Sequence, residues 1–204
     1  MSETSYLEKL GLFAIEDFLD REFCTRLTNF IENAEQLETP LAEYRNGEKL
    51  DESANVRPKA VVDMPREFPD EIRRKLEELA PQIENYFGVK TNSVLNPYAI
   101  IYDEGRFTAK HVDAVHSEGV SRSTSDKKIT TILFLNDEST ETGDGGYVGG
   151  KLTFYGLIGN EAFEKFGYPV GGKTGLLLAF PTHFLHEVTP VVSGIRYVIS
   201  SGYY

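Results

Sequence analysis

The sequence lacks the features that mark secreted and membrane-bound proteins. Cys24 is the only cysteine among 204 residues, so no disulfide can form within the chain, which is typical of a protein from a reducing compartment. No apolar run is long enough to cross a membrane, and the first residues, MSETSYLEKLGLF, lack the basic start and apolar stretch of a signal peptide. These absences predict a cytoplasmic location and no membrane partner.

Basic residues are in the minority, since 21 Lys and Arg face 32 Asp and Glu and give a formal net charge of −11. This excess argues against a partner bound through phosphates, so no nucleic acid is expected. A peptide, a protein or a small molecule suits this surface better. Hydrophobic residues make up 40% of the chain, and no linker or repeat divides it. We therefore expect a single domain over residues 1–204, with the oligomeric state left open.

Residues 1–90 contain two segments with apolar residues at helical spacing. The first, REFCTRLTNFIENAEQL, follows Asp20, a good N-cap residue. The second, PREFPDEIRRKLEELAPQIENYFG, is expected to begin at Pro69 and to end at Gly88. The polar segment between them is expected to be a loop with a short strand around residues 60–62. These features predict a helical support layer.

From about residue 91 the period of the apolar pattern changes to two. Short runs rich in β-branched and aromatic residues alternate with glycine and polar turns. These runs are PYAIIY, KITTILFLN, GGKLTFYG, GKTGLLLAFP, HFLHEVTPV and GIRYVISSGYY. Short strands with no helix between most of them predict an antiparallel barrel or a two-sheet jelly roll. The expected fold class is therefore α+β, with the N-terminal helices packed on one face of the sheets.

All four histidines lie in two short segments. His111 and His116 belong to FTAKHVDAVHSEG, and His183 and His186 belong to FPTHFLHEVTPVVSGIRYVIS. Alternate residues of a strand face the same way, so His111 and Asp113 present an imidazole and a carboxylate side by side. A third ligand from another strand would complete a two-histidine, one-carboxylate face suited to Fe(II) that binds a co-substrate and oxygen. The alternative is a turn whose side chains bond only to the backbone.

Arg196 gives the second candidate site. The segment HEVTPVVSGIRYVIS places His186 on one strand and returns with Arg196, which shares a strand face with Val198 and Ser200. An arginine directed into an apolar barrel is an uncompensated charge unless an anion meets it. A dicarboxylate co-substrate, held at its far carboxylate by the guanidinium fork, would meet this need. The alternative is an internal salt bridge with a carboxylate of the protein.

Five segments from about residue 97 to residue 204 resemble, in order, the Fe(II)- and 2-oxoglutarate-dependent dioxygenases. They are YDEGRFTAKHVD, ITTILFLND, GGKLTFYG, GLLLAFP and HEVTPVVSGIRYVIS. The resemblance is to the prolyl 4-hydroxylase-like branch, including the ten-residue step from His186 to Arg196. Near the start of the chain, LGLFAIEDFLDREFCTRL is similar to the family's entry into its first supporting helix. The resemblance therefore covers nearly the whole chain.

This resemblance implies a double-stranded β-helix (jelly roll) core over about residues 91–204. It implies that His111, Asp113 and His186 are the catalytic metal site for Fe(II), and that 2-oxoglutarate chelates the iron and pairs with Arg196. O2 is the other co-substrate, and ascorbate is a further candidate cofactor. The implied reaction hydroxylates an unactivated C–H bond and releases succinate and CO2. The favoured substrate is a prolyl residue of a peptide or protein, and the alternative is a free amino acid or another small metabolite.

The resemblance also suggests residues of the co-substrate pocket. Tyr102, nine residues before His111, matches a tyrosine that lines this pocket, although an ordinary aromatic at a strand end would look the same. Ser200 matches a position that often adds a hydroxyl contact to the far carboxylate. Phe134 stands where many prolyl hydroxylases have a tyrosine that bonds this carboxylate. Thr130, on the same strand face, could partly replace the missing hydroxyl.

Other positions have two interpretations each. His183 is three residues before His186 and therefore on the opposite face of an extended strand, which makes it a supporting or surface residue. His116 either touches substrate at the mouth of the site or is an exposed loop residue. The polar loops at 117–128 and 137–149 either act as mobile lids or have no function.

Two further classes of function remain open for this sequence. A jelly roll can bind a small ligand without turning it over, in which case the histidines and Asp113 are structural. A metal-dependent hydrolase would use the same ligands but would give Arg196 no purpose. Dependence on O2 separates an oxygenase from a hydrolase, and dependence on a metal separates both from a binding module.

Overall fold

The computed structural model describes residues 3–38, 44–45, 48–49, 58–113, 127–141, 146–157 and 165–204. Its helices are α1 (Glu3–Lys9), α2 (Arg21–Asn33) and α3 (Glu67–Phe87). The strands before residue 120 are β1 (Phe13–Ile15), β2 (Leu37–Glu38), β3 (Tyr44–Arg45), β4 (Glu48–Lys49), β5 (Lys59–Val61), β6 (Tyr98–Tyr102) and β7 (Thr108–His111). Those after it are β8 (Ile129–Phe134), β9 (Tyr147–Gly149), β10 (Leu152–Phe154), β11 (Tyr168–Val170), β12 (Leu177–Pro181), β13 (His186–Val188), β14 (Val191–Gly194) and β15 (Arg196–Tyr203).

Helix α2 begins directly after Asp20, as predicted. The Asp20 carboxylate accepts a 2.7 Å hydrogen bond from the backbone N–H of Phe23, which satisfies one of the unpaired donors of the first turn. The helix buries Phe23, Cys24, Leu27 and Ile31 along one face. The apolar spacing seen in the sequence is therefore the face that packs on the core.

Helix α3 begins at Glu67, two residues before the expected start at Pro69. A proline is tolerated in the first turn because the N–H groups there have no acceptor within the helix. The helix ends as predicted at Gly88, whose φ of 67° is in the left-handed region that glycine adopts without strain. No helix in the described ranges combines the length and apolar character required to span a membrane.

The strands form two main sheets. One has seven strands in the order β1-β12-β8-β15-β6-β5-β2, and the other has four in the order β11-β10-β13-β7. Strands β14 and β9 make a separate pair, as do β3 and β4, and every strand pairing among the described elements is antiparallel. The short strand expected at residues 60–62 is β5. The chain thus has the predicted α+β composition of antiparallel sheets with N-terminal helices.

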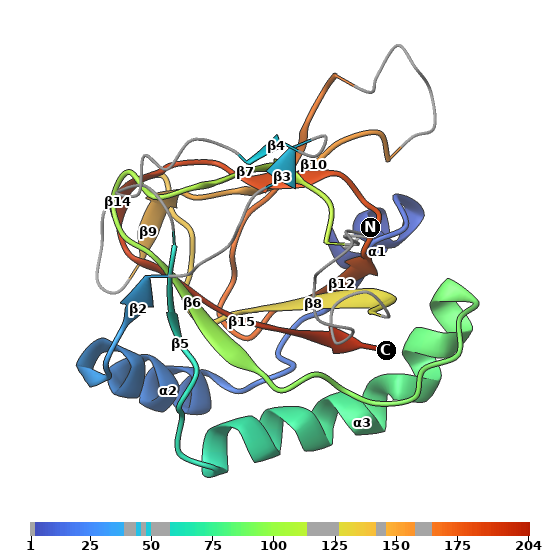
Figure 1. Ribbon diagram of the computed structural model, residues 1–204, viewed down its shortest axis with the longest axis horizontal. Helices are drawn as coiled ribbons and strands as arrows, with labels where there is room; N and C mark the ends of the chain where they lie inside the picture. The colour runs from blue at the N-terminus through green and yellow to red at the C-terminus, as the bar shows by residue number, and fades with distance from the viewer. Residues whose placement is uncertain are drawn as a thin grey trace.

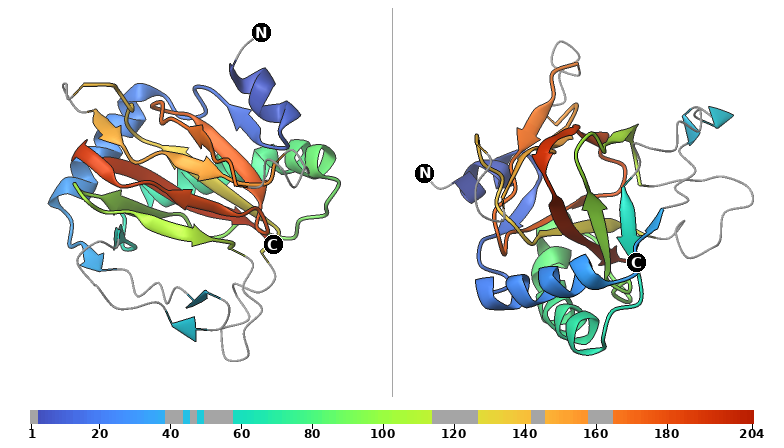
Figure 2. Two further views of the ribbon diagram at one scale, coloured as in Figure 1. Left: turned by 90° about the horizontal axis from the view of Figure 1, so that it is seen from above. Right: turned by 90° about the vertical axis from the view of Figure 1, so that its left-hand side faces the viewer.

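Helices and sheets are stacked in layers. Figure 1 shows α2 and α3 together below the seven-stranded sheet, with β7 and β10 of the four-stranded sheet above it. One apolar core fills the space between the helices and the seven-stranded sheet, and a second lies between the two sheets. The right-hand view in Figure 2 shows α2 and α3 together on one side of the sheets, whereas α1, next to the N-terminus, lies apart from them. The inter-sheet space is therefore enclosed by strands on both sides.

Strand β15 contributes side chains to both cores. Tyr197 and Ile199 belong to the core on the helix side, whereas Val198 belongs to the core between the sheets. Successive residues of a strand point to opposite faces, so Arg196 and Ser200 share the direction of Val198. All three line one pocket between the sheets. The register of β15 thus aims the predicted arginine at the inter-sheet space.

Candidate active site

His111 and His186 lie opposite each other on neighbouring strands. His111 ends β7, His186 begins β13, and the antiparallel pairing of these strands places the two residues in register. Their ring centroids are 4.3 Å apart. Asp113 follows just beyond β7, where its backbone N–H donates a 2.9 Å hydrogen bond to the Thr182 carbonyl. Strand pairing and this backbone bond therefore bring the three side chains together.

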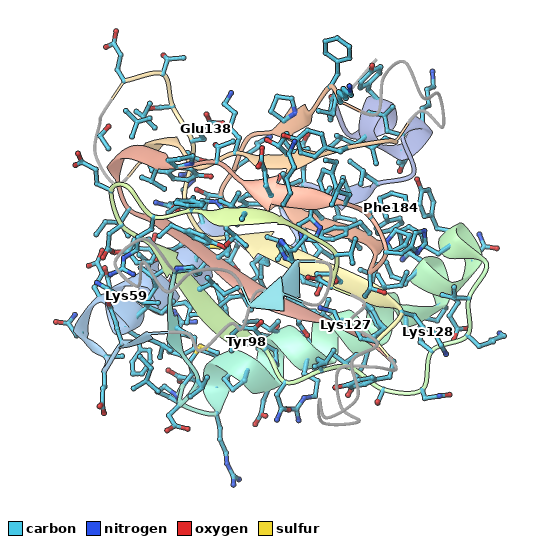
Figure 3. The ribbon with its side chains drawn as sticks, turned by 45° about the horizontal axis from the view of Figure 1, so that its top comes forward. Lys59, Tyr98, Lys127, Lys128, Glu138 and Phe184 are labelled. Atoms are coloured by element: carbon cyan, nitrogen blue, oxygen red, sulfur yellow. The ribbon has the colours of Figure 1, made fainter. Side chains whose placement is uncertain are left out.

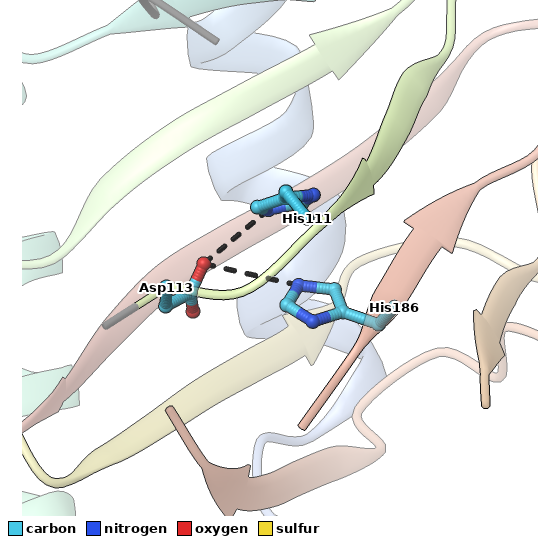
Figure 4. Close-up of side chains that lie close together, drawn as sticks. All are labelled: His111, Asp113 and His186. Atoms are coloured by element: carbon cyan, nitrogen blue, oxygen red, sulfur yellow. Dashed lines mark ion pairs between the residues drawn. The ribbon is translucent and has the colours of Figure 1, made fainter. Parts of the chain in front are cut away.

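The three side chains turn toward a common point (Figure 4). Asp113 Oδ1 lies 3.3 Å from His111 Nε2 and 3.8 Å from His186 Nε2. One possible ligand atom from each residue lies within 4.8 Å of the other two. Within the described part of the chain, this is the one group of three or more His, Cys, Asp or Glu side chains that could hold a metal ion.

Backbone contacts determine which ring nitrogen of each histidine carries the hydrogen. His111 Nδ1 lies 2.9 Å from the Ala109 carbonyl oxygen, and His186 Nδ1 lies 2.8 Å from the Phe184 carbonyl oxygen. A carbonyl oxygen only accepts, so each Nδ1 donates and each neutral ring keeps a lone pair on Nε2. Both lone pairs then face an oxygen of Asp113. Such a set of electron-rich atoms is favoured when a cation lies among them.

His186 is held in the neutral form. Burial lowers its pKa to about 4, although the nearby Asp113 carboxylate acts in the opposite direction. The rings of Phe154 and Phe180 lie beside the imidazole, with centroids 5.8 Å and 4.9 Å away. The neutral imidazole is the form that binds a metal, so this side chain needs no proton release at neutral pH.

Asp113 is held in the ionised form by contacts on its second oxygen. The Thr130 hydroxyl donates a hydrogen bond to Oδ2, and the Lys127 ammonium lies 3.4 Å from the same atom (Figure 3). Burial raises the pKa of Asp113, but the positive charge of Lys127 is the largest opposing influence, and together with the two neighbouring imidazoles it holds the pKa well below its usual range. Because Oδ2 is engaged, Oδ1 is the oxygen left to face a metal.

Arg196 lines the same pocket as the three metal-binding candidates. The residue is 1% exposed, and its Nε and Nη1 atoms have no hydrogen-bond partner within the described ranges. The guanidinium carbon lies 4.9 Å from the centre of the Tyr102 ring and 5.2 Å from that of Phe134. Among the described residues, no carboxylate forms an ion pair with Arg196, so the alternative of an internal salt bridge is not supported within that part of the chain. An uncompensated buried guanidinium is costly unless a bound anion compensates it.

The other expected pocket residues are close by. Tyr102 lines the pocket, and its hydroxyl lies 2.9 Å from the Thr108 hydroxyl. Ser200 is buried in the pocket within reach of the Tyr98 hydroxyl. Thr130 also lines the pocket, but its hydroxyl donates to Asp113, a contact with the metal-binding side chain that was not expected from the sequence.

His183 is exposed, as expected for a surface residue, and packs on the Phe184 ring with centroids 5.2 Å apart. It lies in the turn between β12 and β13 and not, as predicted, on an extended strand. His116 lies outside the described residues, as do 117–126 of the first predicted lid and 142–145 of the second.

Two residues near the site were not expected from the sequence. Lys127 belongs to the polar loop expected at 117–128, yet its ammonium faces Asp113 inside the pocket. Tyr147 is fully buried, and the Arg196 charge acts on its hydroxyl. As the only aromatic residue in the polar run NDESTETGDGGYVGG, Tyr147 could have been singled out from the sequence.

The sequence matches the model of the 2OG-Fe(II) oxygenase superfamily over residues 98–204. No curated protein matches it. The matched residues span β6 to the end of the chain and include the His-Asp-His cluster and Arg196.

Solved structures with a similar fold include three prolyl hydroxylases. A prolyl-4-hydroxylase from Pseudomonas putida has a TM-score of 0.68 and 16% identity, with 98% of this chain and 96% of that chain covered. A prolyl hydroxylase from Trichoplax adhaerens, in complex with a peptide fragment of the hypoxia inducible factor oxygen degradation domain, has a TM-score of 0.69 and 19% identity, with 98% and 86% covered. A collagen prolyl hydroxylase from Paramecium bursaria chlorella virus 1, in complex with 2-oxoglutarate, has a TM-score of 0.60 and 18% identity, with 95% and 94% covered.

Proposed function

Because the chain belongs to the 2OG-Fe(II) oxygenase superfamily, we propose that it is a hydroxylase whose Fe(II) is bound by His111, Asp113 and His186. Members of this family use Fe(II), 2-oxoglutarate and O2. Two histidines and one carboxylate on one side of an iron leave positions open for a co-substrate and oxygen. When bound, these groups supply an oxidation that converts 2-oxoglutarate to succinate and CO2 and hydroxylates a C–H bond.

The main support for this proposal is the direction of the Nε2 lone pairs of the two histidines. His111 and His186 each donate their Nδ1 hydrogen to a backbone carbonyl, which leaves Nε2 without a hydrogen and facing Asp113 Oδ1. Thr130 and Lys127 engage the other carboxylate oxygen. The cluster therefore offers three donor atoms to a cation while its other polar atoms are already bonded.

Arg196 is proposed to bind the distal carboxylate of 2-oxoglutarate. It is buried, lies in the same pocket as the metal-binding cluster and has unpaired donor atoms. A carboxylate is the natural partner of a guanidinium fork, and its charge would offset the cost of burying the arginine. Tyr102 would keep the guanidinium in place with its ring, and Ser200 would add a hydroxyl to the pocket wall.

We further propose that the two sheets form a double-stranded β-helix, and that residues 1–204 are a single domain. The facing seven- and four-stranded antiparallel sheets support this arrangement. In it, the apolar walls between the sheets exclude water from the reacting atoms, while the pocket residues orient the co-substrate. The helices support the sheet from the opposite face.

The proposed substrate is a prolyl residue of a peptide or protein. The similar solved structures are prolyl hydroxylases, and one of them is in complex with a peptide. A free amino acid or another small metabolite is the alternative. Proline-containing peptides and free amino acids are to be compared as substrates by the succinate they release in air and without O2. Turnover that continues without O2 would contradict the oxygenase proposal.

The metal site is tested by anaerobic titration with Fe(II) and then 2-oxoglutarate, followed by the weak visible charge-transfer band of the chelated co-substrate. We expect the band in the wild type and none in His186→Ala. The matched control is His183→Ala, because this exposed histidine is three residues away on the same segment and should leave the band unchanged. A wild type that neither binds Fe(II) nor forms the band would reject the proposal.

A further inference from the structure

The Tyr102 and Phe134 rings lie beside the Arg196 guanidinium, and the Tyr147 ring lies near the arginine side chain, but the three rings differ in what their hydroxyl groups do. The Tyr102 hydroxyl is already paired with the Thr108 hydroxyl at 2.9 Å, and Phe134 has none. The Tyr147 hydroxyl is buried and has no hydrogen-bond partner of standard geometry within the described part of the chain. Of the three rings, only Tyr147 therefore has a hydroxyl that is available to the guanidinium.

Tyr147 and Arg196 come from different strand pairs and are packed together by the backbone around them. Tyr147 begins β9 and pairs with Gly194 of β14, two residues before Arg196. A Cβ placed on Gly150 would lie 3.0 Å from Arg196 Cδ and 3.3 Å from Tyr147 Cε2, so both side chains pack against this glycine. A Cβ on Gly172 would lie 2.0 Å from the Tyr147 hydroxyl oxygen. The phenol ring thus lies close against the backbone at Gly150 and Gly172.

Two groups lie within reach of the Tyr147 hydroxyl, the Arg196 guanidinium and the backbone of Gly172, and Arg196 is the charged one. Burial raises the pKa of Tyr147, and the Arg196 charge is the largest influence in the opposite direction. Glu138 (Figure 3) also acts on Tyr147, but its carboxylate forms an ion pair with Lys151 at 3.3 Å rather than with Arg196. An arginine is only a donor, so the phenol oxygen is an acceptor that a guanidinium N–H can use.

We propose that Tyr147 is a positioning residue for Arg196, whose hydroxyl fixes the direction of the guanidinium fork and thereby sets the affinity of the pocket for the distal carboxylate of 2-oxoglutarate. The inference rests on the proposed function of the site. Tyr147 would act on the co-substrate through Arg196, because it is not among the residues that line the pocket. It would not act on the metal, which His111, Asp113 and His186 would hold.

The test is the variant Tyr147→Phe, which removes only the hydroxyl. The ring and its packing are kept, so the variant should remain folded, with a melting temperature close to that of the wild type. Dissociation constants are measured anaerobically on the Fe(II)-loaded protein with two ligands, 2-oxoglutarate and 2-oxopentanoate, which has the same carbon chain without the distal carboxylate. We expect affinity for 2-oxoglutarate to fall about tenfold, as for the loss of one hydrogen bond to a charged group. Affinity for 2-oxopentanoate and for Fe(II) should not change.

The matched control is Tyr155→Phe, whose hydroxyl donates to Glu187 away from the pocket, and which should bind both ligands as the wild type does. An unchanged 2-oxoglutarate affinity in Tyr147→Phe would overturn the inference, and so would an equal loss for both ligands, which would indicate a general structural role. Either result leaves the proposed function intact if the wild type still binds 2-oxoglutarate. A wild type that does not bind 2-oxoglutarate would instead reject the proposed function.

Discussion

The Thr130 hydroxyl donates a hydrogen bond to Asp113 Oδ2 and leaves Asp113 Oδ1 directed at the two histidines. Thr130 belongs to β8 of the seven-stranded sheet, whereas His111 belongs to β7 of the four-stranded sheet. The bond therefore joins the two sheets at the metal-binding cluster. It also sets the orientation of a carboxylate that lies just beyond the end of its strand.

We predict that Thr130→Val weakens Fe(II) binding about tenfold, because partners that orient a metal-binding carboxylate contribute on this scale. Valine keeps the shape of the side chain and removes the donor. The control is Thr131→Val, since Thr131 is also buried in β8 but points to the other face of the sheet. Affinity is measured by anaerobic titration with Fe(II). Equal affinities in wild type and Thr130→Val would show that Lys127 and the backbone suffice to orient Asp113.

Burial of His186 predicts that the metal-free protein loses stability in mild acid. Its pKa is about 4 in the folded state against 6.5 for the free side chain, so the unfolded chain binds a proton between these values and the folded chain does not. The free energy of unfolding should therefore fall as the pH is lowered from 6.5 to 4, by up to about 3 kcal/mol, since each unit corresponds to about 1.4 kcal/mol.

His186→Phe is the variant that isolates this contribution, because phenylalanine retains the aromatic packing against Phe154 and Phe180. Urea unfolding in the presence of a chelator is compared at several pH values. The stability of the variant relative to the wild type should rise as the pH falls through this window. A constant difference between the two proteins would contradict the prediction.

Arg196→Met should make the co-substrate-free protein more stable while it removes co-substrate binding. Replacing an uncompensated buried charge by an apolar side chain of similar length stabilises a protein by about 1–4 kcal/mol. Affinity for 2-oxoglutarate should fall about 100-fold, as when one partner of a buried charge pair is removed. Melting curves and anaerobic titrations measure the two effects. Arg26→Met, on the exposed surface of α2, is the control and should alter neither. A less stable Arg196→Met protein would mean that the arginine has a counter-ion outside the described residues.

Much of this architecture could be predicted from the sequence because it depends on local periodicity. A period of two identifies the strands and places Arg196 and Ser200 on one face of their strand. His111 and Asp113 do lie together as predicted, although Asp113 is just beyond the strand and is positioned by its backbone bond to Thr182. The N-cap at Asp20 is likewise a local signal, which the structure confirms. Such features depend only on residues that are close together in the sequence.

The contacts that could not be predicted depend on how distant strands are aligned. Thr130 reaches Asp113, and Lys127 faces the same carboxylate, only because of the way β8 lies against the end of β7. Tyr147 of β9 lies near Arg196 of β15 because β9 pairs with β14, the strand just before β15, and because Gly150 leaves space for both side chains. The glycine-rich turn around Tyr147 has no periodic pattern in the sequence that would predict this contact. A period of two tells which face a residue is on but not which residue of another strand lies opposite.

Because the two faces of β15 serve different parts of the protein, they limit which insertions and deletions this strand can accept. Its alternate residues fill the helix-side core and the site, so a one-residue insertion before Arg196 would exchange the two sets. Tyr197 and Ile199 would then face the pocket, and the arginine would point into the apolar core between the seven-stranded sheet and helices α2 and α3. Such a chain would fail to fold before it failed to bind a co-substrate. Selection for a stable core alone thus preserves the direction of Arg196, and the pocket can diversify at its mouth without losing the anion-binding end.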